Sequence, residues 1–355
     1  MASKAFSYHF NMFTVYHGTA RSRHNSQFKA LWRGDLEASD PVTTLPPLAV
    51  ITNRGSTRNL RGDAWVDPLL AGEAGVTHHK VDAGDIAAAV AACARDGAET
   101  IVVNGGDGTV GLVFAALLNS SASARLPALA LLPAGKTNMT GADWSLRGSP
   151  EAALTAVLRA RREGTLAQHV ITRPVLTLRQ SAEAPPLYGA FFGAAEVVDG
   201  IRFCRKHIYP LKMPNAFSHA AAIGVLLTRA LFGGGGQMAV ENEAQAIESG
   251  TFFAVIVTAL DEMLLGIRAE HGAMTSAPLS YISLRPGLGA MRAGLGALLR
   301  KRIAAGAGRT VERFARVSLA FTGAYTLDGE LYEADAAQPL VLEGNRTLDF
   351  IRLPA

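Results

Sequence analysis

Cysteine is scarce in this sequence, which contains only Cys93 and Cys204 among 355 residues, far apart and in no metal-binding spacing. Two isolated thiols argue against a disulfide framework or a cysteine-based metal cluster, and they suit a reducing cytoplasm. The chain also lacks a run of about 18 uncharged apolar residues, so we expect no membrane-spanning helix. Aromatic residues amount to 7% and do not alternate with basic ones, and the net charge is only +4, which together disfavour nucleic acid as a partner.

Apolar residues, in contrast, make up 49% of the chain, against 18% charged residues. This composition is typical of a globular protein, and the length suffices for two domains with separate cores. The modest positive charge suits an acidic ligand or an anionic membrane surface. Residues 1–45 differ from the rest: they carry scattered aromatic and basic residues without the apolar core of a signal peptide, and we expect a poorly ordered N-terminal extension there.

Short apolar strands alternate with helices after the Pro46-Pro47 pair. The expected strands are 48–51, 101–103 and 129–132, and the expected helices are 85–95 and 109–118. This alternation predicts an α/β fold, with a doubly wound parallel sheet over residues 46–167. From about residue 168 the segments become β-branched or aromatic, which predicts a β-rich, sandwich-like second domain over 168–355. A cleft between the two domains is the expected ligand site.

The sequence Asn104-Gly105-Gly106-Asp107-Gly108-Thr109 comes directly after one of the expected strands. Its glycines let the backbone turn with exposed N–H groups, and the helix that follows adds the positive end of its dipole, which favours phosphate. Asp107 repels phosphate but can hold Mg²⁺ that bridges to it. The loop therefore indicates a nucleoside triphosphate as the ligand.

Two familiar nucleotide motifs fit these glycines less well. Gly106, Gly108 and Gly111 match G-x-G-x-x-G, but no acidic residue lies between Asp107 and Asp143, whereas a dinucleotide site needs one about 20 residues on. The Gly135-Lys136-Thr137 sequence is similar to the end of a Walker A loop, but position 130 is alanine where that motif has glycine. A glycine-rich turn that serves only the fold is the remaining alternative.

Asn53, the glycine-rich loop and the loop 133–138 each follow an expected strand. Because the carboxyl ends of parallel strands lie at one edge of the sheet, we expect the three segments to converge on one ligand site. In this order, a strand-end Asn, a GGDGT loop, a Pro-x-Gly-x-Thr-Asn loop and a late Asp-Gly-Glu resemble the diacylglycerol kinase catalytic family. That family includes sphingosine and ceramide kinases and bacterial soluble diacylglycerol kinases, and the resemblance covers roughly residues 46–355.

The resemblance implies an α/β nucleotide-binding domain followed by a β-sandwich lipid-binding domain. It also implies a role for each matching position. The residues expected to bind ATP are Asn53, Gly105, Gly106, Asp107, Gly108, Thr109, Gly135, Thr137 and Asn138. Asp107 is expected to be the Mg²⁺ ligand, and Asp328 and Glu330 are the expected catalytic residues, with Asp328 the general base.

Three positions depart from the family pattern: Arg54 replaces the usual Pro, and Lys136 and Met139 occupy positions in the second loop where other residue types are common. The departures bear on which lipid is used, because that loop lies near the expected cleft. Lys136 is either a further phosphate contact or a solvated lysine. The spacing of Asp328 and Glu330 also fits an ordinary Asp-Gly hairpin turn between two short strands.

The segment 288–303 carries apolar residues near helical spacing, flanked by basic ones. They are Leu288, Met291, Leu295, Leu298, Leu299 and Ile303, with Arg292, Arg300, Lys301 and Arg302. A basic amphipathic helix can lie on an anionic bilayer. The alternative is an ordinary helix packed on the second domain, and the glycines of the segment lower its helix propensity.

Residues and resemblance together predict an ATP-dependent lipid kinase that transfers the γ-phosphate to the hydroxyl of a neutral lipid. It is expected to be cytoplasmic and peripherally associated with the inner face of the membrane. Diacylglycerol is the first candidate acceptor, and ceramide or a sphingoid base comes next. A kinase of a soluble acceptor and a silent lipid-binding protein are the alternatives, and a homodimer is left open.

Overall fold

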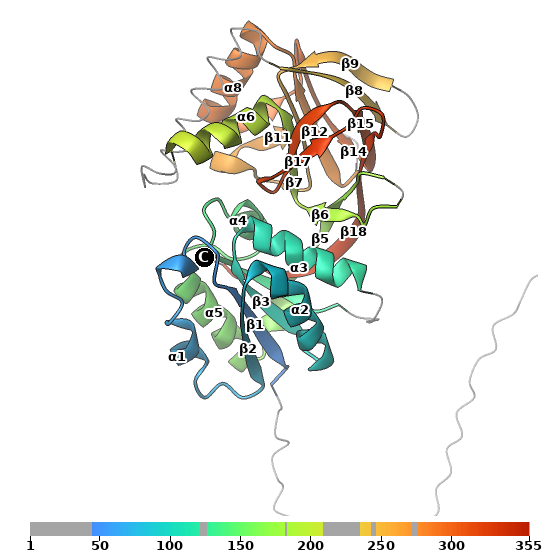
Figure 1. The fold of residues 1–355 in the computed structure, drawn as a ribbon. Helices are drawn as coiled ribbons and strands as arrows, with labels where there is room; N and C mark the ends of the chain where they lie inside the picture. The colour runs from blue at the N-terminus through green and yellow to red at the C-terminus, as the bar shows by residue number, and fades with distance from the viewer. Residues whose placement is uncertain are drawn as a thin grey trace, which may run out of the picture. The chain divides into compact units, whose positions relative to one another are not determined.

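The computed structural model describes residues 45–120, 126–181, 183–208, 235–242, 246–271 and 276–354. Residues 45–355 form one compact unit, in which an α/β part and a β-rich part can be distinguished (Figure 1). The extension expected over residues 1–45 falls, apart from Leu45, outside the described residues.

The α/β part is built on four parallel strands in the order β2-β1-β3-β4. Its elements are β1 (Leu48–Asn53), η1 (Asn59–Arg61), α1 (Val66–Leu70), β2 (Val76–Val81), η2 (Ala83–Asp85), α2 (Ile86–Arg95), β3 (Thr100–Gly105), α3 (Asp107–Asn119), β4 (Ala128–Pro133), α4 (Met139–Trp144), α5 (Pro150–Arg162) and η3 (Leu166–His169).

The central strands are buried on both faces. Their residues alternate between two cores: Ile51 and Val103 pack with α2 and α3, while Val50 and Val102 pack with α1 and α5. Continuous apolar runs are what a parallel sheet covered by helices on both sides requires. β2 is the edge strand, and its residues, polar at the centre, are half-buried or exposed. The doubly wound sheet predicted from the sequence is confirmed.

The β-rich part contains two further layers of strands. Its elements are β5 (Val170–Arg179), β6 (Leu187–Gly189), β7 (Phe191–Ala195), α6 (Glu196–Phe203), η4 (Cys204–Ile208), β8 (Gly236–Asn242), β9 (Ala246–Phe252), β10 (Ala254–Thr258), η6 (Leu264–Gly266), β11 (Arg268–Glu270), β12 (Leu279–Leu284), α8 (Leu288–Arg300), β13 (Arg302–Ala304), β14 (Arg309–Phe314), β15 (Arg316–Ala320), β16 (Gly323–Leu327), β17 (Glu330–Ala334) and β18 (Leu340–Ile351).

Six of these strands form an antiparallel sheet in the order β14-β12-β10-β7-β16-β17. One face of this sheet, including Val255, Val257 and Tyr281, packs in the same core as Val317 and Leu319 of β15. The opposite face, including Ile282 and Leu284, packs against the alanines of α8. The β-rich part predicted from the sequence is therefore confirmed as a sandwich with a helix on its outer face.

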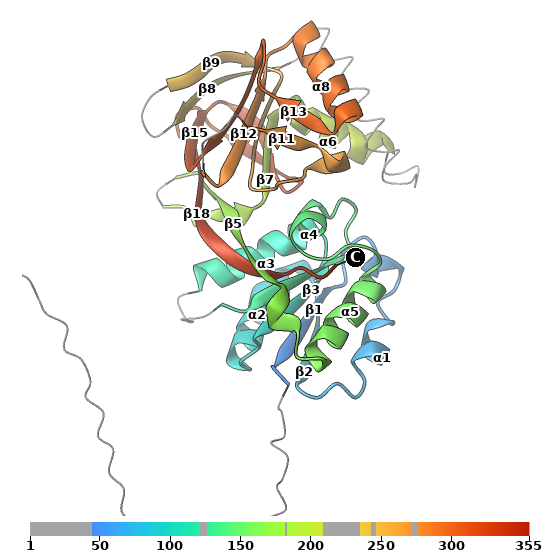
Figure 2. The same ribbon diagram turned by 180° about the vertical axis from the view of Figure 1, so that it is seen from behind.

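The last strand connects the two parts. β18 pairs with β4 in parallel at Phe350 and Leu129, and along its length it pairs with β5 and β15 in antiparallel register (Figure 2). The ladder with β5 shifts register between Glu343 and Arg346, which marks a bulge. The sheet that begins with the N-terminal strands thus continues without a break into the β-rich part.

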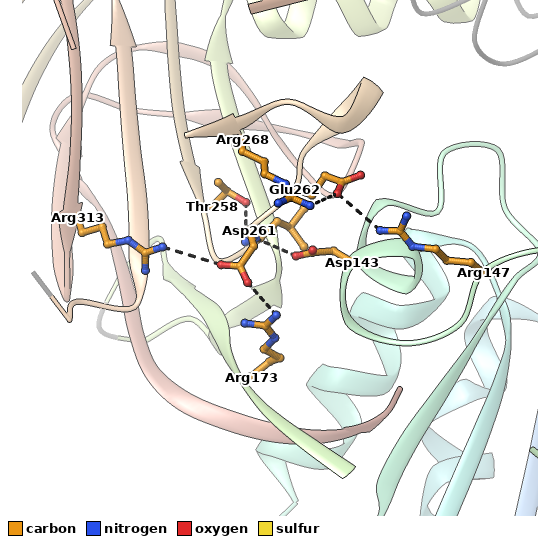
Figure 3. Close-up of polar contacts among 9 residues, drawn as sticks. Asp143, Arg147, Arg173, Thr258, Asp261, Glu262, Arg268 and Arg313 are labelled. Atoms are coloured by element: carbon orange, nitrogen blue, oxygen red, sulfur yellow. Dashed lines mark hydrogen bonds and ion pairs between the residues drawn. The ribbon is translucent and has the colours of Figure 1, made fainter. Parts of the chain in front are cut away.

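A polar network also joins the two parts (Figure 3). The carboxylate of Asp143, at the end of α4, accepts a hydrogen bond of 2.8 Å from the backbone N–H of Asp261, which follows β10. Arg147 lies 3.6 Å from Glu262, and Arg173 lies 2.8 Å from the Asp261 carboxylate. Burial raises the pKa of Asp143, while the hydrogen bond from Arg268 lowers that of Glu262. The network fixes the loop after β10 against the α/β part.

No helix among the described residues has the length and apolar character needed to cross a membrane.

Candidate active site

A cavity of about 870 Å³ runs between the α/β part and the β-rich part. Most of the residues singled out from the sequence line it, namely Asn53, Gly106, Asp107, Gly108, Thr109, Gly135, Thr137, Asp328 and Glu330. Gly105 and Asn138 are not in the wall, but they shape the loops behind it. The structure therefore brings the strand-end loops and the late Asp-Gly-Glu sequence to one place.

The two glycine-rich loops touch through their backbones. A Cβ atom added to Gly135 would lie 2.5 Å from the Cα of Gly106, and one added to Gly106 would lie 2.9 Å from the Cα of Gly135. Gly105 is equally confined, because a Cβ there would lie 2.5 Å from the Thr109 side chain. A side chain at Gly106 or Gly135 would push the two loops apart, and one at Gly105 would collide with Thr109, so glycine is required by space rather than by backbone angle.

Helix α3 begins inside the motif rather than after it. Asp107, Gly108 and Thr109 form its first turn, and Gly106 precedes it without a side-chain cap. The first N–H groups of a helix have no partner within it, and they form a site for an anion. The helix start predicted at Thr109 was two residues late. Glycine and aspartate have low helix propensity, and here the packing of the buried apolar residues of α3 outweighs it.

Two asparagines hold the loops in shape. Asn53 donates a hydrogen bond of 2.8 Å to Oγ1 of Thr109 and accepts one of 2.9 Å from the N–H of Gly55. Asn138 has a left-handed backbone, with φ of 52°, and its side-chain oxygen accepts a hydrogen bond of 2.7 Å from the N–H of Gly135. Both residues thus bind loop backbone. From the sequence alone, this structural role could not be distinguished from contact with a ligand.

Asp107 is almost fully buried, and both its oxygens accept backbone hydrogen bonds. Oδ2 accepts from the N–H of Met139 at 3.2 Å and Oδ1 from that of Thr140 at 3.1 Å. Asp107 therefore joins the first turn of α3 to the first turn of α4. Burial raises its pKa, while these hydrogen bonds act in the opposite direction.

Asp328 occupies the two-residue turn of the β16–β17 hairpin, and it is 9% exposed. Its φ of 49°, with 91° at Gly329, is the left-handed geometry that such a turn requires. Its carboxylate accepts hydrogen bonds from the N–H groups of Ala190, at 3.0 Å, and Phe191, at 2.9 Å. The Asp-Gly turn and the carboxylate in the cavity wall are thus the same feature, so the two interpretations of this sequence were not exclusive.

Burial raises the pKa of Asp328 to about 8, and the nearby carboxylate of Asp107 adds to this rise. The two buried carboxylates influence one another across the cavity. Each has its oxygens turned to backbone N–H groups, and no ion pair involves either of them in the described part of the chain. Uncompensated buried negative charge is expensive, so this end of the cavity favours a cation.

Gly189, at the end of β6, is a site residue that the sequence did not indicate. A Cβ at this position would lie 2.5 Å from Oδ2 of Asp328. The absence of a side chain is what leaves room for the carboxylate. No local pattern identifies this glycine, because the contact joins residues that are far apart in the chain.

Glu330 differs from Asp328 in its surroundings. Its side chain is 61% exposed and lies 3.7 Å from the guanidinium of Arg205. Arg205 also donates a hydrogen bond of 2.6 Å to the carbonyl of Gly329. Arg205 thus supports the hairpin turn from the side of η4, and it too was not indicated by the sequence.

The far end of the cavity is apolar. It lies between the outer face of the six-stranded sheet and the helices α6 and α8. The apolar residues in its wall include Val197, Ile201, Ile256, Met263, Ile282 and Leu298. Lys136 and Cys204 line the same cavity, and desolvation lowers the pKa of Lys136 and raises that of Cys204.

The chain resembles known proteins in its sequence and in its fold. Residues 47–168 match the family model of the diacylglycerol kinase catalytic domain. Among curated proteins, none matches the sequence significantly. A solved structure of a diacylglycerol kinase from Bacillus anthracis str. Sterne is 13% identical with a TM-score of 0.57, and the alignment covers 87% of this chain and 97% of that one.

Two further structures from the same organism, both provisionally described as a diacylglycerol kinase, have TM-scores of 0.60 at 16% and 15% identity, with the same coverage. At such low identity these structures are evidence of the fold, whereas the match over residues 47–168 is evidence of the family. The segment that matches contains both glycine-rich loops and Asn53. Residues 47–168 therefore carry a diacylglycerol kinase catalytic domain, and this domain makes the chain a lipid kinase.

Proposed function

We propose that this lipid kinase transfers the γ-phosphate of ATP to the hydroxyl of a neutral lipid, with diacylglycerol as the first acceptor. One observation carries the proposal. A single cavity has glycine-rich loops at one end, an apolar wall at the other, and the buried carboxylate of Asp328 among its lining residues. Such a cavity is suited to a reaction between a charged donor and a water-insoluble acceptor.

The glycine-rich end is suited to phosphate groups. The first turn of α3 offers backbone N–H groups as donors. The loops around it approach closely at Gly106 and Gly135, which have no side chains to cover these donors. Phosphoryl transfer needs mainly positioning and the neutralisation of charge. Lys136, in the wall of the same cavity, adds a positive charge at this end.

The donor set fits Mg²⁺ in part. Asp107 would hold the ion, and a cation there would relieve the repulsion between Asp107 and Asp328 that contributes to the raised pKa of Asp328. No cluster of three or more His, Cys, Asp or Glu side chains suited to a metal occurs among the described residues, so phosphate oxygens and water would complete the coordination. When bound, Mg²⁺ would neutralise charge on the phosphates.

Asp328 is suited to act as general base. Its raised pKa of about 8 lies near the working pH, which is where a base accepts a proton efficiently. The N–H groups of Ala190 and Phe191 orient the carboxylate. In the transfer step the lipid oxygen forms a bond to the γ-phosphorus, the bond from that phosphorus to the β,γ-bridging oxygen breaks, and the hydroxyl proton passes to Asp328.

The decisive experiment measures transfer of labelled phosphate from ATP, with Mg²⁺, to diacylglycerol, monoacylglycerol, ceramide and sphingosine in mixed micelles. We expect diacylglycerol to be labelled most efficiently. Preferential labelling of ceramide or sphingosine would reassign the acceptor and leave the reaction class intact. Measurable ATP binding without labelling of any lipid would overturn the proposal, and NAD as an added acceptor would then test for a soluble substrate.

A further inference from the structure

Helix α8 packs against the protein through small residues and leaves large ones outside. Ala290, Ala293 and Ala297 are buried against the six-stranded sheet. On the other side of the helix, Leu288, Leu295 and Leu299 are 57%, 48% and 75% exposed. The sequence left open whether these leucines meet a bilayer or pack on the second domain, and in the structure alanines form the packed face.

This exposure is concentrated on one element. Six large hydrophobic residues are exposed in the described part of the chain, and three of them are these leucines of α8. At 100° per residue, positions 288, 292, 295 and 299 fall within a narrow arc, so Arg292 lies among the leucines. We call Leu288, Arg292, Leu295 and Leu299 the outer face of α8.

The charge around the outer face is positive. No aspartate or glutamate occurs from Arg285 to Val311. Arg300 and Lys301 follow the last exposed leucine, and among the described residues no ion pair involves them or Arg292. Arg302 is neutralised by Glu270 at 2.8 Å. Leucines surrounded by unneutralised basic groups are the pattern that binds anionic lipid surfaces.

The outer face adjoins the wall of the cavity. Gly294, Ala297 and Leu298 of the same helix line its apolar end. One side of α8 therefore faces the space where an acyl chain would lie, and the neighbouring side faces outward. Both ribbon views show α8 at the outer side of the β-rich part, beside α6, which lines the same cavity (Figures 1 and 2).

We propose that the outer face of α8 docks on the surface of an anionic bilayer and thereby brings the apolar end of the cavity to the membrane. The inference rests on the proposed function, because only a lipid acceptor has to be withdrawn from a bilayer. The leucines would insert at the level of the acyl chains, and Arg292, Arg300 and Lys301 would contact the anionic headgroups. The same surface would thus attach the protein to the bilayer and give the lipid acceptor access to the cavity.

The test is flotation of the purified full chain with vesicles of neutral phosphatidylcholine alone or mixed with phosphatidylglycerol. The triple variant Leu288→Ser, Leu295→Ser and Leu299→Ser should bind the mixed vesicles at least about tenfold more weakly than wild type. Leu60→Ser is the matched control, because Leu60 is 73% exposed and lies outside α8. The variant Arg292→Gln, Arg300→Gln and Lys301→Gln should lose the preference for phosphatidylglycerol and its sensitivity to salt.

Vesicle binding does not require turnover, so it separates this inference from the proposed function. With a short-chain diacylglycerol dispersed in detergent, the leucine variant should keep the activity of wild type, and with vesicle-borne diacylglycerol it should lose it. Equal vesicle binding by wild type and leucine variant would overturn the inference. If sedimentation then showed a wild-type dimer and a monomeric leucine variant, the outer face would instead be an interface between two copies of this chain.

Discussion

At the scale of single residues, the site depends on a carboxyl group whose surroundings raise its pKa toward the neutral range. Asp328 lies in a hairpin turn, is buried, and has a pKa raised from its ordinary value of 3.8 to about 8. Its neighbours in space, Gly189 and the N–H groups of Ala190 and Phe191, come from the β6–β7 region. The Asp-Gly sequence predicted the turn, but nothing in the sequence predicted the partners, because turn and partners meet only through the pairing of β16 with β7.

The raised pKa of Asp328 predicts a dependence of stability on pH. A carboxyl whose pKa is higher in the folded state stabilises that state when protonated, so its contribution is complete below pH 3.8 and is lost as the pH rises through about 8. The free energy of unfolding of Asp328→Asn should therefore depend less on pH over this range than that of wild type. At pH 8 the variant should be more stable than wild type. Urea unfolding at several pH values measures this. Parallel curves for wild type and variant would contradict the assigned pKa.

Gly189→Ala should misplace the Asp328 carboxylate and leave the nucleotide end of the cavity intact. The added Cβ would lie 2.5 Å from Oδ2, so the carboxylate has to move. A displacement of this size costs roughly 100-fold in turnover, whereas ATP binding should not change. Steady-state kinetics with titration of ATP binding measure both. Gly84→Ala is the control, because a Cβ there meets nothing within 4 Å, and similar activity of both variants would contradict a positioning role for Gly189.

At the scale of elements, the sequence was most informative for segments whose own residues determine their secondary structure. The buried runs at β1, β3 and β4 were all predicted as strands, since continuous apolar residues leave few alternatives. β2 was missed because Thr-His-His-Lys at its centre is polar, and it forms a strand only by pairing with β1. The apolar pattern of α8 predicted a helix but left open whether its leucines face a bilayer or pack on the second domain. In the structure alanines form the packed face, and Leu288, Leu295 and Leu299 are exposed.

Asp107 connects two elements, and its proposed role as a metal ligand can be separated from that connection. In Asp107→Asn, the Mg²⁺ concentration for half-maximal activity should rise at least about tenfold, since a neutral amide holds the ion less well than a carboxylate. Asp143→Asn is the matched control, because Asp143 is also a buried aspartate but does not line the cavity. An unchanged requirement for Mg²⁺ in Asp107→Asn would restrict that residue to joining α3 and α4.

At the scale of the whole molecule, the cavity exists because two parts of the chain are held in a fixed relation. β18 extends from one part into the other, and the network around Asp143 and Asp261 ties the loop after β10 to α4. Neither contact could be predicted from the sequence, because each joins segments separated by about a hundred residues or more. The convergence of three strand ends was predictable, since it follows from the topology of a parallel sheet alone.

The network predicts a difference between two substitutions at one position. Asp143→Ala leaves the N–H of Asp261 without its acceptor and should lower the free energy of unfolding by about 1–3 kcal/mol. Asp143→Asn keeps an oxygen for that N–H and should unfold within about 1 kcal/mol of wild type. Urea unfolding of the two variants measures this contrast. Equal losses of stability would show that the hydrogen bond to Asp261 does not hold the two parts together.

The central claim is that one cavity joins the donor loops to an apolar acceptor site through the Asp328 carboxylate. The most direct test is a single-turnover transfer of labelled phosphate from ATP to diacylglycerol by wild type and by Asp328→Asn, with binding of ATP and of lipid measured on the same preparations. We predict that the variant binds both ligands as wild type does and transfers at least about 100-fold more slowly. Transfer at the wild-type rate by a variant that binds both ligands would contradict the account.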